Sequence, residues 1–331
     1  GFAGFHEPTP PTKNYYSIHN SGYLARMAEE TGAFVDDPAW TERNVLPILR
    51  ETARFYRSIC TREDDGLWHL FVTPSTGQDE NGGFNQKDYL CALYSAQYCF
   101  QKAIAYGLDR DGDYASILRD GLAFPALLTD RGFYYSNLGA KNENAGGQKH
   151  PVQLNELAFL PVHTVPSPSA VTAYKKRYDI TINASLPHFA GWTVGEFLIA
   201  GSRLGEAAEW MTDWRNLVAS VLADPDYIQL YESSGNKRSF YITTSGMVAQ
   251  SLLNNVVDDW WGQLVIGQCI PWPGTIAFKN LYSRLGVSLN GDIVGQSATV
   301  RLRAWKDCTF EIHGSCISMK KGEIKTVKLN R

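Results

Sequence analysis

Two adjacent acids in a turn-rich loop are the residues of this sequence best suited to proton transfer. Asp79 and Glu80 follow a short apolar run, Leu70–Val72, and the loop is flanked by Trp68 and Phe84. A carboxyl group beside aromatic rings is a candidate for a raised pKa, because burial disfavours its charged form. Such a group can act as a general acid. The alternative is that Asp79 or Glu80 caps the next helix or lies solvated in a turn.

Helices are predicted on both sides of this loop, because apolar side chains recur there at spacings of three and four residues. The predicted helices cover residues 15–30, 38–59, 87–106, 113–122, 191–205, 206–222 and 244–257. Residues 129–187 carry no strong period and many Gly, Asn, Pro and Ser. We therefore expect a long functional loop with short elements over 129–187.

Short alternating runs replace the helical pattern after about residue 265. Val300, Leu302 and Ala304 face one way, and the residues between them face the other. The Asn-Gly pair at 290–291 and the Lys-Gly pair at 321–322 are interpreted as turns. These patterns predict a small antiparallel β domain at the C-terminus.

Two domains are therefore expected, a helical catalytic domain over 1–265 and a β domain over 266–331. Helical hairpins with long loops at one end are typical of an (α/α)6 toroid, in which the loops form a cleft across the mouth. The predicted fold is mainly α, a partial (α/α)6 toroid of about seven helices with a small C-terminal antiparallel β domain. An α-solenoid is the alternative, since helical periodicity alone does not distinguish the two.

The acid loop carries a resemblance to a known family. The residues Leu70-Phe-Val-Thr-Pro-Ser-Thr-Gly-Gln-Asp-Glu-Asn resemble the acid loop of six-hairpin (α/α)6 glycosidases akin to glycoside hydrolase family 95. In that family the loop has the form Leu-Val-Thr-x-Pro-Ser-x-Ser-Pro-Glu-Asn, and its Glu is the general acid. The resemblance implies that Glu80 is the acid and that Asn81 is its companion.

Weaker similarities extend over most of the chain. Residues 29–32 and 46–56 are similar to the family's helix–turn–helix before the acid loop. Gly-Trp-Thr at 191–193 is similar to a Gly-Trp-Ser helix start, and Thr-Ser-Gly at 244–246 looks like the Thr-Ala-Gly that opens the last barrel helix. The predicted β domain occupies the place of the family's terminal sheet.

The sequence also departs from the family. The family's Asp-Gly-Asn-Phe-Gly before the last helix is replaced by Lys-Arg-Ser-Phe-Tyr-Ile-Thr at 237–243. Its upstream paired Asn motif and its N-terminal β-sandwich have no counterpart in a chain that starts at Gly1. We therefore expect the C-terminal portion of a longer enzyme, and L-fucose specificity is not carried over.

Hydrolysis of a glycosidic bond normally needs a second carboxylate, which activates water or attacks the anomeric carbon. Glu232, which follows Tyr231 in a loop before the last helix, is the first candidate, and Glu156 is its rival. The expected reaction is inverting hydrolysis, in which Glu80 protonates the leaving oxygen. The plainer interpretations are a solvent-exposed loop acid for Glu232 and a capping or turn segment for Glu156.

Polar and aromatic side chains near these acids are suited to bind sugar hydroxyls and sugar rings. Lys149, His150 and Gln153 precede Glu156, and several aromatic residues adjoin loops that a toroid would gather at one rim. The predicted substrate-binding residues are Trp68, Asp79, Asn81, Lys149, His150, Gln153, Trp192, Tyr231, Tyr241 and Trp272. For Trp192, which opens a helix, packing in the core is the alternative.

Charge and motif content argue against several other classes of partner. The chain has 31 Lys+Arg and 34 Asp+Glu, a net charge of −3, which argues against binding to nucleic acid or anionic membranes. No apolar run approaches the ~20 residues that a bilayer span needs. No Walker loop, GxGxxG or HExxH motif occurs, so no cofactor and no metal is predicted. Cys308 and Cys316 flank a predicted hairpin and are expected as free thiols or, in an exported protein, as a disulfide.

Other enzyme and binding classes remain open. A polysaccharide lyase with an (α/α) toroid would use a Tyr or His base beside a charge-neutralising Arg or Asn. A non-catalytic carbohydrate-binding homologue would keep the aromatic cleft without paired acids, and a phosphorylase would need a basic phosphate pocket. The sequence does not name the sugar, the linkage or the oligomeric state, and a secreted or periplasmic location is favoured.

Overall fold

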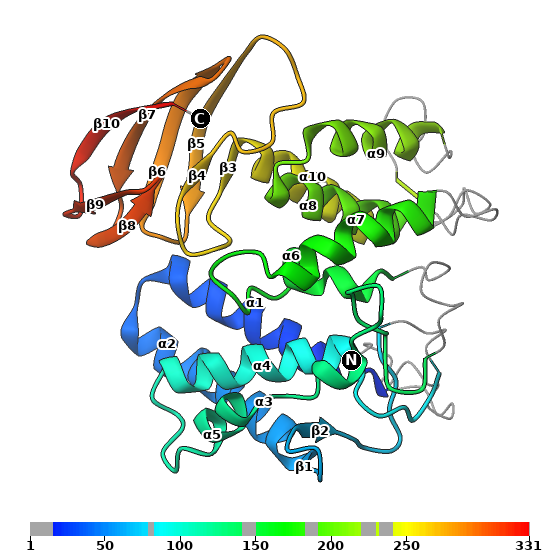
Figure 1. The fold of residues 1–331 in the computed structure, drawn as a ribbon. Helices are drawn as coiled ribbons and strands as arrows, with labels where there is room; N and C mark the ends of the chain where they lie inside the picture. Colours follow the sequence, from blue (N-terminus) through cyan, green and yellow to red (C-terminus); the bar gives the residue numbers. More distant parts are fainter. Residues whose placement is uncertain are drawn as a thin grey trace. The chain divides into compact units, whose positions relative to one another are not determined.

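The computed structural model describes residues 16–78, 83–140, 150–182, 191–219, 230–231 and 241–330. The chain divides into two compact units, each with a hydrophobic core. The first unit comprises residues 1–162 with 167–188, and the second comprises 163–166 with 189–331. Figure 1 labels their helices and strands.

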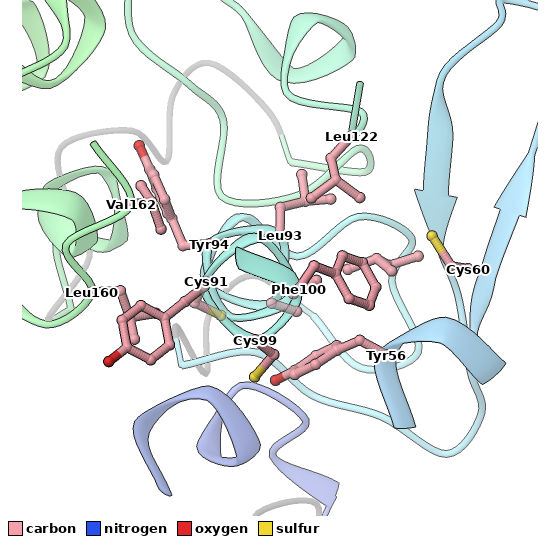
Figure 2. Close-up of a cluster of buried hydrophobic side chains, with 14 of the residues drawn as sticks. Tyr56, Cys60, Cys91, Leu93, Tyr94, Cys99, Phe100, Leu122, Leu160 and Val162 are labelled. Atoms are coloured by element: carbon pink, nitrogen blue, oxygen red, sulfur yellow. The ribbon is translucent and has the colours of Figure 1, made fainter. Parts of the chain in front are cut away.

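The first unit is built around one buried helix, α4. Its elements are α1 (Asn20–Val35), α2 (Pro38–Asn44), α3 (Leu46–Ser58), β1 (Cys60–Arg62), β2 (Trp68–Leu70), α4 (Leu90–Ala105), α5 (Asp113–Asp120), η3 (Pro125–Leu127), η5 (Val152–Leu154), α6 (Asn155–Ala158) and α7 (Pro168–Ile182). Helix α4 packs against α1, α3 and α5, and it is buried around most of its circumference, as expected of a central helix. Figure 2 shows Leu93, Tyr94 and Phe100 of α4 in the core, to which Tyr56 and Leu122 also belong.

The predicted helix over 38–59 is two helices, α2 and α3. The carboxylate of Asp37 caps α2 by accepting hydrogen bonds from two backbone N–H groups of its first turn. Pro47 lies in the first turn of α3, where the missing N–H of a proline costs no helical hydrogen bond. A new helix can therefore begin there, and Leu49 and Ala53 continue the predicted buried face.

Helix α7 corrects the prediction of a long loop over 129–187. Ala170, Ala173 and Tyr174 are buried at helical spacing, but charged and β-branched residues fill much of the helix and weaken its period. Its start is fixed by Ser167, whose hydroxyl accepts a hydrogen bond of 3.1 Å from the backbone N–H of Ala170.

Helices α8 (Gly191–Leu204), α9 (Ala207–Ala219) and α10 (Ile242–Val256) belong to the second unit and confirm three predicted helices to within a few residues. Helix α8 packs against both others. Gly195 lets α8 and α10 approach closely, because a Cβ there would lie 2.7 Å from Cε of Met247. Trp210 of α9 is fully buried in the core that these helices share.

A β module follows α10, as the alternating pattern predicts. Its strands are β3 (Val257–Asp258), β4 (Val265–Ile266), β5 (Thr275–Ser283), β6 (Val287–Val294), β7 (Ser297–Ala304), β8 (Cys308–Ile312), β9 (Ser315–Met319) and β10 (Ile324–Asn330). An antiparallel sheet has the order β10-β7-β6-β5, and β8 pairs with β9. Buried and exposed residues alternate along β7, which confirms the predicted pattern. Leu264 and Ile266 pack in the core of this module, and the division at 265 stays a prediction.

One of the two predicted turns is wrong. The Asn-Gly pair at 290–291 lies inside β6, whereas the Lys-Gly pair at 321–322 does form a turn. A Cβ at Gly291 would lie 2.4 Å from the carbonyl oxygen of Thr299 and 2.9 Å from Cζ of Phe278. Close packing between strands, rather than a turn, therefore requires this glycine.

The cysteines are free thiols. Cys308 pairs with Met319 across the β8–β9 hairpin, and Cys316 pairs with Glu311. Because the two cysteines are not cross-strand partners, the disulfide considered for an exported protein is not formed.

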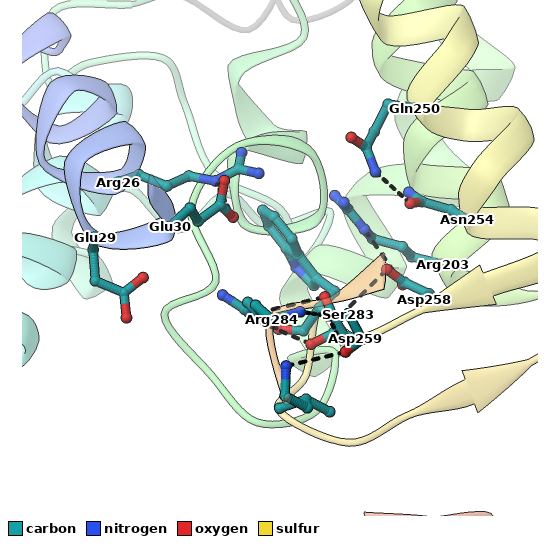
Figure 3. A network of polar contacts seen from close by, with 12 residues as sticks. Arg26, Glu29, Glu30, Arg203, Gln250, Asn254, Asp258, Asp259, Ser283 and Arg284 are labelled. Carbon is teal, nitrogen blue, oxygen red and sulfur yellow. Dashed lines mark hydrogen bonds and ion pairs between the residues drawn. The ribbon is translucent and has the colours of Figure 1, made fainter. Parts of the chain in front are cut away.

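Buried and partly buried charges join α8, β3 and β5 in the second unit. Arg203 Nε lies 3.5 Å from Oδ2 of Asp258, and the Arg203 guanidinium lies 3.5 Å from the ring centroid of Trp260. Asp259 Oδ2 accepts hydrogen bonds from Ser283 Oγ at 2.6 Å and from the backbone N–H of Arg284 at 3.0 Å. Figure 3 shows both sets of contacts.

The described residues thus form a mainly helical chain with a C-terminal antiparallel sheet. The helices are more numerous than the about seven expected, because 38–59 is split and both α6 and α7 lie in the predicted loop. Their closure into a toroid, rather than a solenoid, stays a prediction. Within the described ranges, every helix is too short or too polar to span a bilayer.

Candidate functional site

The two sides of the predicted acid loop are hydrogen-bonded to each other. Asp79, Glu80 and Asn81 lie outside the described residues. On either side of them, Ser75 N donates to Asn85 Oδ1 and Asn85 N donates to Ser75 O, both at 2.8 Å. The loop therefore begins and ends on a paired stem.

The stem is also attached to the segment that precedes α1. Thr76 N donates to the carbonyl oxygen of Tyr16 at 2.9 Å, and Ile18 N donates to that of Thr76 at 3.2 Å. A pocket of about 450 Å³ lies beside these contacts, a volume that suits a small ligand. Its walls are formed by Tyr16, Ser17, Ile18, Asn20, Ser21, Leu24, Phe55, Val72 and Pro74.

Three polar side chains meet immediately before the acid pair. Asn155 Nδ2 donates a hydrogen bond of 3.0 Å to Gln78 Oε1. The hydroxyl of Tyr23 lies 2.7 Å from Gln78 Oε1 and 2.5 Å from Asn155 Oδ1, and its proton can be donated to either. Gln78 and Asn155 are buried, so this cluster connects α1, the acid loop and α6 in a low-dielectric setting.

Glu156, the rival second carboxylate, is directed toward Ser167. It is buried, and its two oxygens accept hydrogen bonds from Ser167 N at 2.8 Å and Ser167 Oγ at 2.7 Å. Since Ser167 begins α7, these contacts support the capping interpretation of Glu156. The catalytic role of Glu156 stays a prediction.

Two histidines lie close to this cluster. His19 is buried and packs edge-on against Tyr23, with ring centroids 5.3 Å apart. Burial, and then the proximity of His150, lower the pKa of His19 to about 3, so its imidazole is neutral at physiological pH. His19 Nδ1 has no hydrogen-bond partner among the described residues.

The polar segment before Glu156 is partly described. His150 and Gln153 are buried, and Gln153 Nε2 donates to the carbonyl oxygen of Tyr134 at 3.1 Å. No described residue donates a hydrogen bond to Gln153 Oε1, so this oxygen can accept one from a ligand hydroxyl or a water. Lys149 lies outside the described residues.

Trp68, in β2, contacts side chains of α3 and of the end of α5. Its Nε1 donates to Asp120 Oδ2 at 3.3 Å, and the guanidinium of Arg57 lies 5.3 Å from its ring centroid. These contacts hold the indole in the fold, and its role in substrate binding stays a prediction.

In the second unit, two helix starts meet beside Tyr231, the residue that precedes the predicted base in the sequence. A Cβ at Gly191 would lie 2.2 Å from Thr244 Oγ1 and 2.6 Å from the carbonyl oxygen of Tyr231. Tyr241 N donates to Leu230 O at 2.8 Å. The N-terminal ends of α8 and α10 therefore meet at Tyr231, the residue before Glu232, which itself lies outside the described residues.

The other two aromatic residues of the prediction pack within the second unit. Trp192 Nε1 donates a hydrogen bond to Glu196 one turn later on α8. Trp272 packs edge-on against Trp210, with ring centroids 5.2 Å apart. The structure thus assigns them packing contacts, and their contact with substrate stays a prediction.

Sequence reasoning missed His19, Tyr23 and Gln78. Tyr23 lies on a helical apolar stripe, so its type and spacing indicate core packing. Nothing in the spacing of His19 and Gln78 connects them to Asn155, because their proximity arises from tertiary packing. Within the described ranges, no group of His, Cys, Asp and Glu side chains could hold a metal ion.

Comparison with known proteins supports the fold. No family model matches the chain, and no curated protein matches it. Among solved structures it is similar to one described as "Putative kojibiose phosphorylase from human microbiome", with a TM-score of 0.60 and 13% sequence identity. The match covers 94% of this chain and 44% of that one, so the chain spans less than half of that structure. At this level of identity the likeness concerns the fold alone, and it gives no support to family 95 in particular.

Proposed function

We propose that the chain is a carbohydrate-active enzyme that cleaves a glycosidic bond, with Glu80 as its general acid. The observation that carries the proposal is the hydrogen bond of 3.0 Å between Asn155 and Gln78. It joins the loop that bears Glu80 to the polar segment that bears Gln153, two segments that the sequence marks independently for sugar chemistry. The likeness to a carbohydrate-processing fold supports the same reading.

Glu232 is the better candidate for the second carboxylate. Both oxygens of Glu156 already accept hydrogen bonds from Ser167, and this bonding opposes their use as a base. Glu232 instead follows Tyr231, whose carbonyl lies against the starts of α8 and α10. In an inverting mechanism Glu80 protonates the leaving oxygen while a second carboxylate activates a water, and the assignment of Glu232 to that role stays a prediction from the sequence. A separation of ~6.5–9.5 Å between the two carboxyl groups is required for inversion, against ~5 Å for retention.

Phosphorolysis is the second candidate function. It is favoured by the similar structure, which is described as a phosphorylase. In that reaction inorganic phosphate takes the place of water as nucleophile, and the second carboxylate is not needed. Glu80 would protonate the leaving oxygen in either reaction.

The test is cleavage of kojibiose, the sugar in the description of the similar structure, and of a panel of other disaccharides, with and without inorganic phosphate. Hydrolysis releases reducing sugar without phosphate, whereas phosphorolysis releases a sugar 1-phosphate only with it. Glu80→Gln should reduce kcat by about 10²–10⁴-fold. Glu51→Gln, at an exposed position on α3, is the matched control. Near-full activity of a folded Glu80→Gln protein would overturn the acid assignment, and an unsaturated, ultraviolet-absorbing product would indicate a lyase.

A further inference from the structure

His69 is a buried imidazole that the proposed mechanism does not use. It lies in β2, where its Nδ1 is 2.6 Å from Asp88 Oδ2 and its Nε2 is 3.0 Å from Asp65 Oδ2. The other oxygen of Asp88 accepts from Leu70 N at 2.7 Å, and that of Asp65 accepts from Leu67 N at 3.0 Å. Each of the four carboxylate oxygens thus lies at hydrogen-bond distance from a nitrogen.

This arrangement favours the protonated form of the ring. A neutral imidazole has one N–H donor and one lone pair, so it satisfies one carboxylate and repels the other. An imidazolium donates to both, through charge-assisted hydrogen bonds. The position of His69 between Asp65 and Asp88 therefore favours the protonated ring, although burial also raises the pKa of Asp88.

Asp88 connects His69 to the far end of the acid loop. Besides its two side-chain contacts, Asp88 N donates to the carbonyl oxygen of Leu70 at 3.0 Å. Asp88 is fully buried and has a φ of 55°, in the left-handed region that few residues other than Gly, Asn and Asp adopt. Residues 69–70 and Asp88 therefore join the two ends of the segment 71–87, to which the predicted site residues 79–81 belong in the sequence.

The carboxylates around His69 favour its cationic form, and the nearby charge of Lys87 opposes it. Glu63 Oε2 lies 3.9 Å from His69 Nε2 and 2.5 Å from Lys87 Nζ, so this third carboxylate is shared with a lysine. Burial lowers the pKa of His69, but the hydrogen bonds to Asp88 and Asp65 outweigh it and raise the pKa above the ordinary 6.5. The thiol of Cys60, which also lies near Asp88, has its pKa raised to about 12 by burial and stays neutral.

We propose that His69 is a positioning residue whose imidazolium holds the two ends of the acid loop together, and that deprotonation loosens the loop. The sign follows from linkage. Because the pKa is raised in the folded state, the stabilisation is complete below about pH 6.5 and is lost as the pH rises through the folded-state pKa. The clamp itself does not depend on the proposed function, and only its effect on Glu80 does.

The primary measurement is hydrogen–deuterium exchange of the whole chain from pH 5 to pH 9, corrected for intrinsic exchange rates. The amides of residues 71–78 and 83–87 should exchange faster above the folded-state pKa of His69 than below it, by about twofold or more. NMR titration of the His69 ring should give a pKa above 6.5. A ring that titrates at or below 6.5, or loop protection that is independent of pH, would overturn the proposal.

Two variants separate a clamp from a general loss of structure. Asp65→Asn changes only the partly exposed carboxylate, so the protein should fold and the pH at which the loop loosens should move down. His69→Asn keeps one donor toward Asp88 and should remove the pH dependence altogether. His163→Gln, at an exposed histidine, is the control and should leave the transition where it is. An unshifted transition in Asp65→Asn contradicts the clamp.

The outcome is distinguishable from that of the proposed function. If loop exchange depends on pH as described while Glu80→Gln remains active, the clamp is correct and the acid assignment is wrong. If both hold, kcat should fall at alkaline pH with the same midpoint as loop protection, and this midpoint should move with it in Asp65→Asn. A midpoint in kcat that stays fixed while loop protection shifts would contradict a positioning role for His69.

Discussion

Asn155 and Gln78, 77 positions apart in the sequence, share a buried hydrogen bond of 3.0 Å. Each is adjacent to an acid that the sequence singles out, Gln78 two residues before Glu80 and Asn155 one residue before Glu156. Tyr23 completes the cluster from α1. The cluster of these three side chains thus joins three distant parts of the chain.

Loss of this contact should weaken the fold of the first unit. Asn155→Ala leaves the oxygen of Gln78 with one fewer donor in a buried place, so the free energy of unfolding should fall by ~1–3 kcal/mol. Urea denaturation measures the change. Asn44→Ala, at an exposed amide on α2, is the control and should change stability by less than about 0.5 kcal/mol. Equal effects of the two substitutions would contradict the importance of the cluster.

Glu156 should prove structural. Glu156→Gln turns one of its two acceptor oxygens into a donor facing Ser167, and should reduce stability by ~1–3 kcal/mol while leaving most of kcat. Ser167→Ala should reproduce part of this loss, because it removes the hydroxyl donor. Stability is measured by denaturation and kcat on the cleaved substrate. A fall in kcat of more than about 100-fold with unchanged stability would make Glu156, and not Glu232, the base.

The fold was predictable where the burial of a single element leaves a regular hydrophobic pattern in its own residues. Val300 and Leu302 alternate with exposed residues because β7 has one face in the core, and this period survives in the sequence. The helical period of α7 is weak because charged and β-branched residues fill much of the helix, and its start depends on Ser167 and on the distant Glu156. The turn predicted at Gly291 is wrong for a related reason, because Thr299 and Phe278 on the two neighbouring strands require a glycine there.

The candidate site divides in the same way. Chemistry-bearing residue types in loops, such as Gln153 and His150, are recognisable from sequence as polar groups without a structural period. The partners of these residues cannot be recognised from sequence. His150 lies near His19, and Asn155 near Tyr23, only because the tertiary fold brings α1 close to residues 150–155. A carboxylate that caps a distant helix also cannot be distinguished in sequence from one that binds a substrate, as Glu156 illustrates.

Because the starts of α8 and α10 meet in the second unit, alanine substitutions at two glycines should have opposite effects on stability. Gly191→Ala places a Cβ 2.2 Å from Thr244 Oγ1 and 2.6 Å from the backbone oxygen of Tyr231, so the helices must separate. Stability should fall by ~1–3 kcal/mol. Gly246→Ala, inside α10 with nothing within 4 Å of the added Cβ, should instead raise stability by ~1 kcal/mol. Thermal unfolding compares the two, and a stabilised Gly191→Ala protein would contradict the close approach.

The ion pair of Arg203 with Asp258 predicts a pH-dependent defect in the second unit. Both side chains are buried, so Arg203→Met leaves a carboxylate without its counter-ion at a cost of ~3–5 kcal/mol near neutral pH. Arg301→Met, at an exposed position of β7, is the control and should cost less than about 0.5 kcal/mol.

The sign of the pH dependence tests the cause of that defect. Burial raises the pKa of Asp258, and the nearby Arg203 opposes the rise, so removal of Arg203 raises the pKa further. Because the folded state then binds the proton more tightly than the unfolded state, stability increases as the pH falls through the folded-state pKa. The difference in unfolding free energy between wild type and Arg203→Met should therefore be smaller at pH 5 than at pH 7.5.

Adding Asp258→Asn to Arg203→Met should recover stability at pH 7.5, because it removes the uncompensated charge. A defect that is the same at both pH values, and that Asp258→Asn does not relieve, would mean that Arg203 stabilises the unit by its packing on Trp260 and not by pairing with Asp258.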